Sequence, residues 1–148
     1  MIMQFMPSSF AHIRSDSMGS GHYLASRGRR KHRGVDFDVN KDTEILAVAA
    51  GIVTKLGYPY SPGDLKKGHL RYVEVTTHDL HRTRYFYCKP VCAIGDEILK
   101  RTPIGLQQDL QAVYGTNMDN HLHFEVIDRL DTVLDPIAYL KTQEKGNK

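Results

Sequence analysis

The stretch that decides the fold is Asn120-His121-Leu122-His123-Phe124-Glu125-Val126. Its alternation predicts a β-strand on which His121 and His123 point to one face, while Leu122 and Phe124 point to the core. Neutral imidazole is the commonest nitrogen ligand of metals, so such a strand can bring one ligand and one neighbouring base to a single ion. On its own, a His-x-His pair is more often two ordinary surface histidines, so a second feature is needed.

That second feature is the upstream stretch Lys31-His32-Arg33-Gly34-Val35-Asp36-Phe37-Asp38. His32 and Asp36 are four positions apart, an even spacing that turns both side chains the same way on an extended segment. With His123 they make two imidazoles and one carboxylate, the ligand count of a catalytic zinc site that keeps one position open for water. Asp38 is the rival carboxylate, but its larger spacing leaves Asp36 nearer and better placed.

These two stretches, His-x-Gly-Val-Asp and His-Leu-His-Phe-Glu, resemble the two signatures of the lysostaphin-type zinc metallopeptidases. Members of that family are β-rich enzymes that cut peptide cross-links in peptidoglycan. The resemblance covers about residues 21–140 in the family's order. It implies that His32, Asp36 and His123 bind one zinc ion, and that His121 lies beside the metal as a general base.

One position departs from the family's pattern. Active members carry a further histidine in a Tyr-x-His motif at the end of a middle strand, where it orients the attacked carbonyl or its oxyanion. The corresponding stretch here is Thr83-Arg84-Tyr85-Phe86-Tyr87-Cys88-Lys89-Pro90, which puts Tyr87 at that position. The leukocyte-derived chemotaxin branch shares this change, and its proteins have the same fold and zinc ligands but are regarded as signalling proteins. Four stretches are similar to that branch: Gly21-His22-Tyr23-Leu24-Ala25-Ser26-Arg27, Phe86-Tyr87-Cys88-Lys89-Pro90, Leu110-Gln111-Ala112-Val113-Tyr114 and Asp135-Pro136-Ile137-Ala138-Tyr139-Leu140.

Tyr87 leaves two interpretations of the site open. Zinc lowers the pKa of its bound water to about 7 and polarises the carbonyl, and a phenol O–H still donates to an oxyanion. Loss of one oxyanion donor costs roughly 100- to 1,000-fold in rate. With His121 retained, the first interpretation is a zinc-dependent peptidoglycan endopeptidase in which Tyr87 replaces the usual catalytic histidine. The alternative is a catalytically degenerate zinc-binding structural or binding domain of a larger assembly, such as a phage baseplate.

A third interpretation is receptor signalling, as in the chemotaxin. It requires secretion and disulfides, of which the sequence shows no sign. Cys88 and Cys92 are the two cysteines, with Pro90 between them. We expect two reduced thiols rather than a disulfide or a metal pair.

Length and composition favour one β-dominated domain. A chain of 148 residues has the usual size of a single domain and can bury a core. Gly and Pro are spread among Tyr, Val and Thr, so we expect an all-β or β-dominated fold. The family resemblance implies an antiparallel sheet or sandwich of the lysostaphin-type metallopeptidase kind. Asp135 and Pro136 begin a short C-terminal helical turn. We divide the chain into an N-terminal arm (1–20), a zinc metallopeptidase-like domain (21–140) and a tail (141–148).

Two segments in the middle of the chain have residue patterns that predict their local structure. Residues 70–87 predict a β-hairpin, because two alternating runs flank a polar turn. Residues 57–64 are rich in breakers and predict a loop. Tyr58 and Tyr60 in this loop are candidates for lining a substrate groove, and Tyr114 and Asn117 are candidates for its border.

The charge pattern limits the classes of binding partner that we expect. The net charge is +3, and the dense basic run consists of Arg27, Arg29, Arg30, Lys31 and Arg33. Such a run is usually a solvated loop, but beside a zinc cleft it attracts an anionic polymer such as cell wall. Nucleic acid is not an expected partner, because no recognised binding motif accompanies the charge.

The beginning of the chain, Met1-Ile2-Met3-Gln4-Phe5-Met6-Pro7, lacks the basic region and cleavage site of a signal peptide. No stretch approaches the ~18 apolar residues of a membrane span, so no membrane association is expected. We therefore expect a protein that is virion-associated, or cytoplasmic until released. Its expected partners are a peptidoglycan peptide substrate and other proteins of a phage tail or injection assembly.

Overall fold

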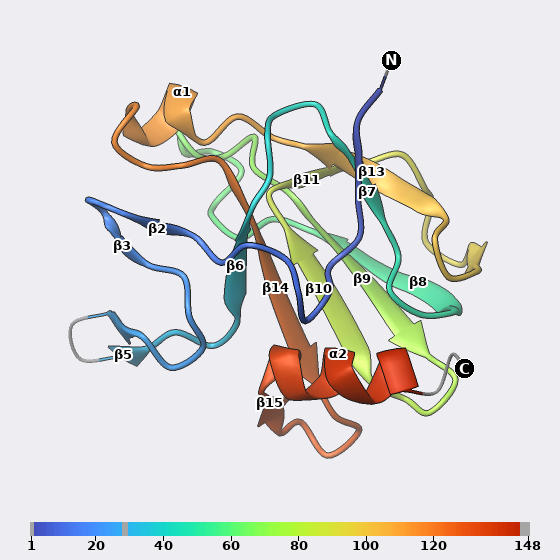
Figure 1. Ribbon diagram of the computed structural model, residues 1–148. Helices are drawn as coiled ribbons and strands as arrows, with labels where there is room; N and C mark the ends of the chain where they lie inside the picture. The colour runs from blue at the N-terminus through green and yellow to red at the C-terminus, as the bar shows by residue number, and fades with distance from the viewer. Residues whose placement is uncertain (1, 28–29, 146–148) are drawn as a thin grey trace.

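The predicted histidine strand is a central strand of a seven-stranded sheet in the computed structural model, which describes residues 2–27 and 30–145 (Figure 1). The strands of this sheet are β6 (Val35–Asp38), β8 (Gly51–Gly57), β9 (Tyr72–Thr77), β10 (Arg82–Phe86), β12 (Glu97–Ile98), β14 (His121–Ile127) and β15 (Val133–Leu134). They follow the order β12-β8-β9-β10-β14-β15, and β6 also pairs with β14. All these pairings are antiparallel, and β9 with β10 forms the predicted hairpin.

A second sheet of four strands has the order β1-β7-β13-β11. Its strands are β1 (Gln4–Phe5), β7 (Glu44–Leu46), β11 (Cys88–Pro90) and β13 (Pro103–Gln107). Two small hairpins lie beside the sheets: β2 (Ser15–Asp16) with β3 (Gly19–Ser20), and β4 (Ser26–Arg27) with β5 (Arg30–Lys31). The β-dominated fold class is therefore confirmed.

The core joins the two sheets. Leu122 and Phe124 are fully buried, as their alternation with the histidines predicts. Phe124 packs against Tyr85 of β10, and both belong to the same hydrophobic cluster as Ile45 and Ile104 of the second sheet. Burying a large apolar side chain contributes about 1.5–3 kcal/mol, so this cluster holds β14 firmly in register. The histidines on the opposite face of β14 thus stand on a rigid base.

Two helices complete the fold, α1 (Gln111–Tyr114) and α2 (Pro136–Lys145). The Asp135 carboxylate caps α2 by accepting a hydrogen bond from the Ile137 N–H at 2.9 Å. The helix is longer than the short turn that we predicted, because Glu144 in its last turn accepts hydrogen bonds from the backbone and hydroxyl of Ser9. Among the described residues, no helix combines the length and apolar character needed to cross a membrane.

Residues 2–20 lie against the two sheets. β1 pairs in parallel with β7, and the ring of Phe5 lies 5.7 Å from that of Phe37. Ile13 forms an antiparallel bridge with Phe37 on β6. The division of the chain into arm, domain and tail stays a prediction, but in the structure residues on both sides of position 20 build the same core and, as shown below, the same site.

Candidate metal centre and active site

The register between β6 and β14 places a carboxylate beside an imidazole. Asp36 is directly opposite His123 in this antiparallel pair, and the Asp36 Oδ1 atom lies 2.8 Å from His123 Nδ1. Directly opposed side chains in a sheet are close neighbours, so the contact follows from the pairing itself. Asp38, the rival carboxylate, is opposite His121 and forms an ion pair with His12 at 3.0 Å instead.

His32 reaches the same point from the segment before β6. The His32 N–H donates to the backbone oxygen of Ala25, directly before β4, at 2.9 Å. This hydrogen bond fixes the backbone of His32 beside the β4–β5 hairpin. Gly34 allows the chain to pass this close to β14: a Cβ there would collide with the backbone oxygen of Phe124 and lie 2.9 Å from His123 Cε1. A glycine is therefore required between the two upstream site residues.

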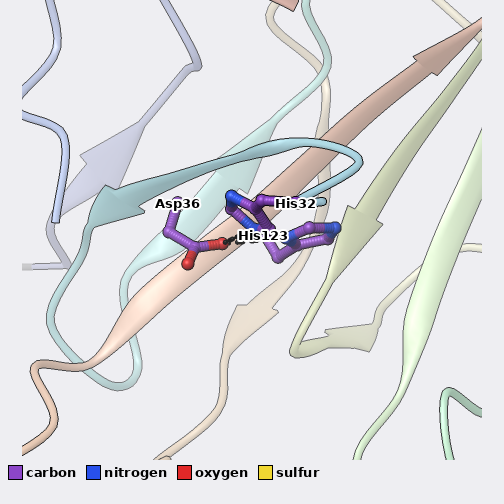
Figure 2. Close-up of side chains that lie close together, drawn as sticks. All are labelled: His32, Asp36 and His123. Atoms are coloured by element: carbon purple, nitrogen blue, oxygen red, sulfur yellow. Dashed lines mark hydrogen bonds and ion pairs between the residues drawn. The ribbon is translucent and has the colours of Figure 1, made fainter. Parts of the chain in front are cut away.

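Three donor atoms converge as a result (Figure 2). His32 Nε2 lies 3.1 Å from Asp36 Oδ1 and 3.0 Å from His123 Nδ1. The structure thus brings together the three residues that we predicted from the sequence as metal ligands, and they are a group able to hold one ion. Their spacing is close to the ~3.3 Å ligand separation of a tetrahedral zinc site with bonds of about 2.0 Å.

The outward-facing nitrogens of the two histidines support this fit. His32 Nδ1–H donates to the backbone oxygen of His22 at 2.9 Å, and His123 Nε2–H donates to Glu125 Oε1 at 2.9 Å. Each hydrogen bond places the ring proton away from the cluster, so in the neutral rings the inward nitrogens keep their lone pairs. The donor set therefore suits a zinc ion.

The charges of the cluster are strongly coupled. Burial raises the pKa of Asp36, but hydrogen bonds with His123 and His32 outweigh this and hold the pKa well below its usual range. Burial also lowers the pKa of His123, yet the carboxylates of Asp36 and Glu125 raise it to about 9. Burial raises the pKa of Glu125 as well, and the hydrogen bond with His123 reverses that shift. Without a metal, a proton on His123 balances the two carboxylates.

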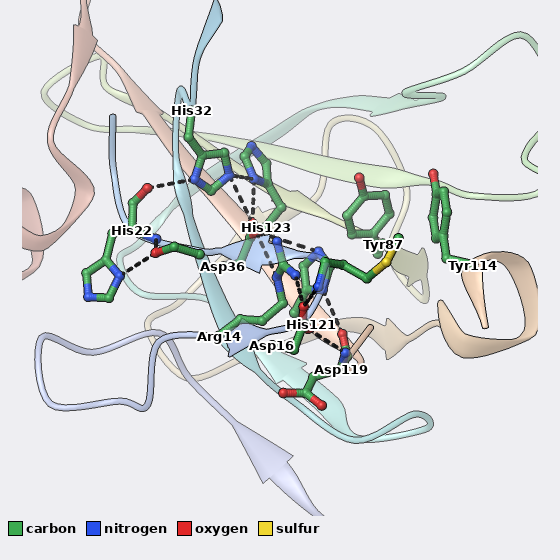
Figure 3. A network of polar contacts seen from close by, with 12 residues as sticks. Arg14, Asp16, His22, His32, Asp36, Tyr87, Tyr114, Asp119, His121 and His123 are labelled. Carbon is green, nitrogen blue, oxygen red and sulfur yellow. Dashed lines mark hydrogen bonds and ion pairs between the residues drawn. The ribbon is translucent and has the colours of Figure 1, made fainter. Parts of the chain in front are cut away.

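His121 lies beside the cluster without being one of its three members (Figure 3). Its Nδ1–H donates to the backbone oxygen of Asp119 at 2.9 Å, which leaves Nε2 as the nitrogen with the free lone pair. That Nε2 atom is 3.8 Å from Asp36 Oδ2. Burial lowers the pKa of His121, so this imidazole is neutral at neutral pH. Its position and protonation suit a base acting beside a metal.

Tyr87 lies at the point where the chain leaves one sheet for the other. It follows β10, precedes β11, and has a left-handed backbone with φ of 69°. Such a conformation is uncommon for a bulky residue and is typically found at functional sites. The Tyr87 ring lies edge-on to His121, with 5.4 Å between ring centroids. Burial raises the pKa of Tyr87 well above its usual value, so its hydroxyl remains a hydrogen-bond donor.

The hydroxyl groups of two other tyrosines form a row with that of Tyr87. The Tyr60 hydroxyl lies 3.5 Å from that of Tyr87, and the Tyr114 hydroxyl donates to that of Tyr60 at 3.0 Å. Tyr60 comes from the predicted loop and Tyr114 from α1, and both line the cavity at the histidine cluster, whereas Tyr58 lies at a separate hollow. Of the loop tyrosines, Tyr60 is thus the one that reaches the site.

The cavity itself has a volume of about 380 Å³. In addition to the residues already described, it is lined by Arg14, Arg27, Pro59, Phe86 and Met118. Arg27 belongs to the predicted basic run, of which Arg29 lies outside the described residues. Cys88 is fully buried in the core, and both cysteines are free thiols.

Several residues of the site were not predicted. Arg14 and Asp16 lie in the predicted N-terminal arm, and no local pattern marks them. Asp119 contributes to the site through its backbone N–H and carbonyl oxygen. Glu125 does carry a signal, because it stands two positions after His123 on a strand and so faces the same way.

Two histidines and a carboxylate that converge in an open cavity are an arrangement found in metal-dependent hydrolases. Residues 30–136 match Peptidase family M23, and the chain belongs to this family. The M23 metallopeptidases are zinc enzymes. Membership confirms the predicted family, whereas the chemotaxin branch within it stays a prediction.

Individual relatives agree with this assignment. The chain is 27% identical over 96 residues to an uncharacterized metalloprotease of Buchnera aphidicola subsp. Baizongia pistaciae, a stretch that makes up 64% of this chain and 23% of that protein. The chain thus spans about a quarter of the length of this curated relative. Among solved structures, it is similar to the catalytic domain of the antimicrobial peptidase lysostaphin from Staphylococcus simulans, with 26% identity, a TM-score of 0.62, and coverage of 86% of this chain and 92% of that chain.

A zinc-containing peptidase from Vibrio cholerae has a similar fold, with a TM-score of 0.62 and 20% identity. This match covers 93% of this chain and 40% of that chain. At this level of identity the likeness concerns the fold alone.

Proposed function

We propose that this protein is a zinc-dependent endopeptidase that cleaves peptide cross-links of peptidoglycan. The observation that carries the proposal is the convergence of His32 Nε2, Asp36 Oδ1 and His123 Nδ1 within 3.1 Å of one another, with the free nitrogen of His121 close by. Membership in Peptidase family M23 supports peptide-bond hydrolysis as the reaction. The likeness to the antimicrobial peptidase lysostaphin supports a bacterial target.

His32, Asp36 and His123 would hold the zinc ion through these three atoms. When bound, zinc supplies a Lewis acid that polarises the peptide carbonyl and makes a water molecule more acidic. Glu125 and the backbone oxygen of His22 hold the two imidazoles in the required orientation. Such outer hydrogen bonds raise the basicity of metal-binding histidines.

His121 would act as the general base. The backbone oxygen of Asp119 keeps the ring proton on Nδ1, so Nε2 is ready to accept a proton from the attacking water. As a protonated imidazole, His121 then donates the proton to the leaving amine. Both transfers would take place at the Nε2 atom of His121.

Tyr87 would stabilise the oxyanion that develops on the attacked carbonyl. Its hydroxyl stays protonated because burial raises its pKa, and a protonated phenol donates a hydrogen bond. We infer that it replaces the histidine expected at this position. The contact between Tyr60 and Tyr114 supports the wall of the cavity from which Tyr87 acts.

The alternative is a catalytically degenerate zinc-binding domain that serves as a structural or binding part of a larger assembly, such as a phage baseplate. The observation that favours it is the same Tyr87, which stands where active members carry a histidine and whose hydroxyl lies 3.5 Å from that of Tyr60. In this case the ion would stabilise the pairing of β6 with β14, and no peptide bond would be cut. Delivery by a phage tail or a similar wall-penetrating particle, and contacts with its other proteins, stay proposals under either function.

The deciding experiment is digestion of purified peptidoglycan sacculi by the zinc-loaded protein, with labelling of the amine termini that are released. We expect new amine termini from the wild-type chain and none from His121→Ala, which keeps all three proposed zinc ligands. Zinc content is measured for both proteins, so that loss of the base is not confused with loss of the metal. No release by a zinc-loaded wild-type protein, or equal release by His121→Ala, would overturn the peptidase proposal.

A further inference from the structure

A buried arginine contacts Asp36 of the proposed metal site. The Arg14 side chain is 4% exposed, and its Nε donates to Asp36 Oδ2 at 3.3 Å. Its Nη1 donates to Asp16 Oδ1 at 2.9 Å. Burying a guanidinium is costly unless carboxylates compensate it, and here two of them do. Arg14 is therefore part of the construction of the site and not a surface charge.

The two oxygens of Asp36 have different partners. Oδ1 faces the imidazoles of His123 and His32, at 2.8 and 3.1 Å. Oδ2 faces Arg14, and Arg27 Nη2 lies 3.6 Å away on the same side. A guanidinium that holds the second oxygen of a carboxylate favours coordination of an ion through the first. The arginine thus selects which oxygen of Asp36 points into the cluster.

The backbone makes the same connection. The Arg14 N–H donates to Asp36 O at 2.8 Å. Gly21 bonds to both segments, because its N–H donates to Arg14 O and its carbonyl oxygen accepts from the Asp36 N–H. A Cβ at Gly21 would lie 2.7 Å from Asp36 Cβ and 3.1 Å from Arg14 Cβ, so only glycine allows this approach. The contact between the two side chains therefore follows from a fixed backbone arrangement.

Asp16 extends the network to the proposed base (Figure 3). While its Oδ1 accepts from Arg14, its Oδ2 accepts a hydrogen bond from the Asp119 N–H at 2.7 Å. The carbonyl of the same residue, Asp119, accepts the Nδ1–H of His121. Asp16 thus holds the residue that determines which nitrogen of His121 is free.

We propose that Arg14 and Asp16 are a pair of positioning residues: Arg14 holds Asp36 with a single oxygen toward the zinc, and Asp16 holds Asp119 so that His121 presents Nε2 to the cavity. The inference rests on the proposed function, since it concerns the same zinc ion and the same base. The two residues act on different partners, so their substitutions should have different effects.

For Arg14, the informative variant is Arg14→Lys. A lysine keeps the positive charge but is a point charge that cannot donate to Asp16 and Asp36 in the fixed fork of a guanidinium. We expect zinc affinity, measured by competition with a chelating dye, to fall roughly 10- to 100-fold. In the cobalt-substituted protein, we expect the visible absorption bands to change, since they report the coordination of the ion.

For Asp16, the informative variant is Asp16→Asn. The amide oxygen can still accept from Arg14, while the amide nitrogen no longer accepts from the Asp119 N–H. We expect zinc affinity and the cobalt spectrum to stay at wild-type values, and kcat on a cross-link peptide to fall roughly 10- to 100-fold with little change in KM. This separation of metal affinity from turnover is not expected from a merely structural role.

Arg82→Lys serves as the matched control, because Arg82 pairs with Asp131 at the opposite end of β10 from the site. Wild-type affinity and spectrum in Arg14→Lys, or wild-type kcat in Asp16→Asn, would overturn the inference. If Arg14→Lys does not fold, Asp16→Asn decides the matter, because it keeps Arg14 and the buried ion pair of Arg14 with Asp36. Failure of the wild-type chain to bind zinc would instead overturn the proposed function itself.

Discussion

Asp36 and His123 face each other across β6 and β14, with 2.8 Å between the Asp36 Oδ1 and His123 Nδ1 atoms. The pairing depends on the register of the two strands, because a slip of one residue would turn the histidines of β14 into the core. The fully buried Leu122 and Phe124 on the other face prevent such a slip. The hydrophobic core and the proposed metal site therefore lie on opposite faces of β14.

Asp36→Asn should remove most of the zinc affinity, since it replaces the one carboxylate of the donor set by a neutral amide. We expect a loss larger than the roughly 10- to 100-fold that is typical of outer hydrogen-bond partners. The measurement is a competition titration with a chelating dye. Asp38→Asn is the control, because Asp38 lies on the same strand but pairs with His12. Equal affinities for the two variants would contradict the assignment.

Zinc binding should release a proton. Burial lowers the pKa of His123, but the neighbouring carboxylates raise it to about 9 in the metal-free protein. At pH 7 this histidine is protonated, and zinc, which binds neutral imidazole, must displace the proton. We expect affinity to rise about tenfold for each pH unit up to about pH 9 and then to level off.

Calorimetry in buffers with different ionisation enthalpies measures this release directly. We expect the observed binding enthalpy at pH 7 to vary with the buffer in proportion to about one proton for each zinc ion bound. A binding enthalpy that is the same in every buffer would show that no proton leaves the cluster, contrary to the raised pKa of His123.

Glu125→Ala should weaken zinc binding without removing a ligand. The Glu125 carboxylate accepts the outer N–H of His123 and fixes the ring with Nδ1 toward the cluster. We expect roughly a 10- to 100-fold loss of affinity. Glu74→Ala is a matched control, since Glu74 is a similarly buried carboxylate of the same sheet that pairs with Arg84. If the control lost as much affinity, the effect would come from the sheet and not from His123.

Tyr87→Phe tests the oxyanion donor. It removes one hydroxyl and keeps the ring that packs against His121. We expect kcat on a cross-link peptide to fall roughly 100- to 1,000-fold, with zinc affinity unchanged. Tyr87→His, which restores the residue expected from the family resemblance, should retain activity because it keeps a donor. A fully active Tyr87→Phe enzyme would show that the oxyanion is stabilised elsewhere.

The sequence was sufficient for the features that depend on spacing along one strand or between neighbouring residues. The shared face of His121 and His123, the shared side of His32 and Asp36, and the cap at Asp135 all follow from such local geometry. These positions are also where the structure brings the expected side chains together.

The remaining features depend on contacts between distant segments, which leave no periodic signal. Arg14 and Asp16 join the site only because residues 13–21 fold back along β6. The last turn of α2 is held by a hydrogen bond from the Ser9 hydroxyl to Glu144, and these residues are 135 positions apart. The left-handed backbone of Tyr87 arises where the chain crosses between sheets, a change of direction that the strand pattern before it does not show.

The most direct test of the central claim is X-ray absorption at the zinc edge of the protein loaded with one equivalent of zinc. We predict nitrogen and oxygen neighbours at about 2.0–2.2 Å, without sulfur at about 2.3 Å, and loss of this signal in His123→Ala. A sulfur neighbour from Cys88 or Cys92, or a spectrum that is unchanged in His123→Ala, would contradict the shared site of His32, Asp36 and His123.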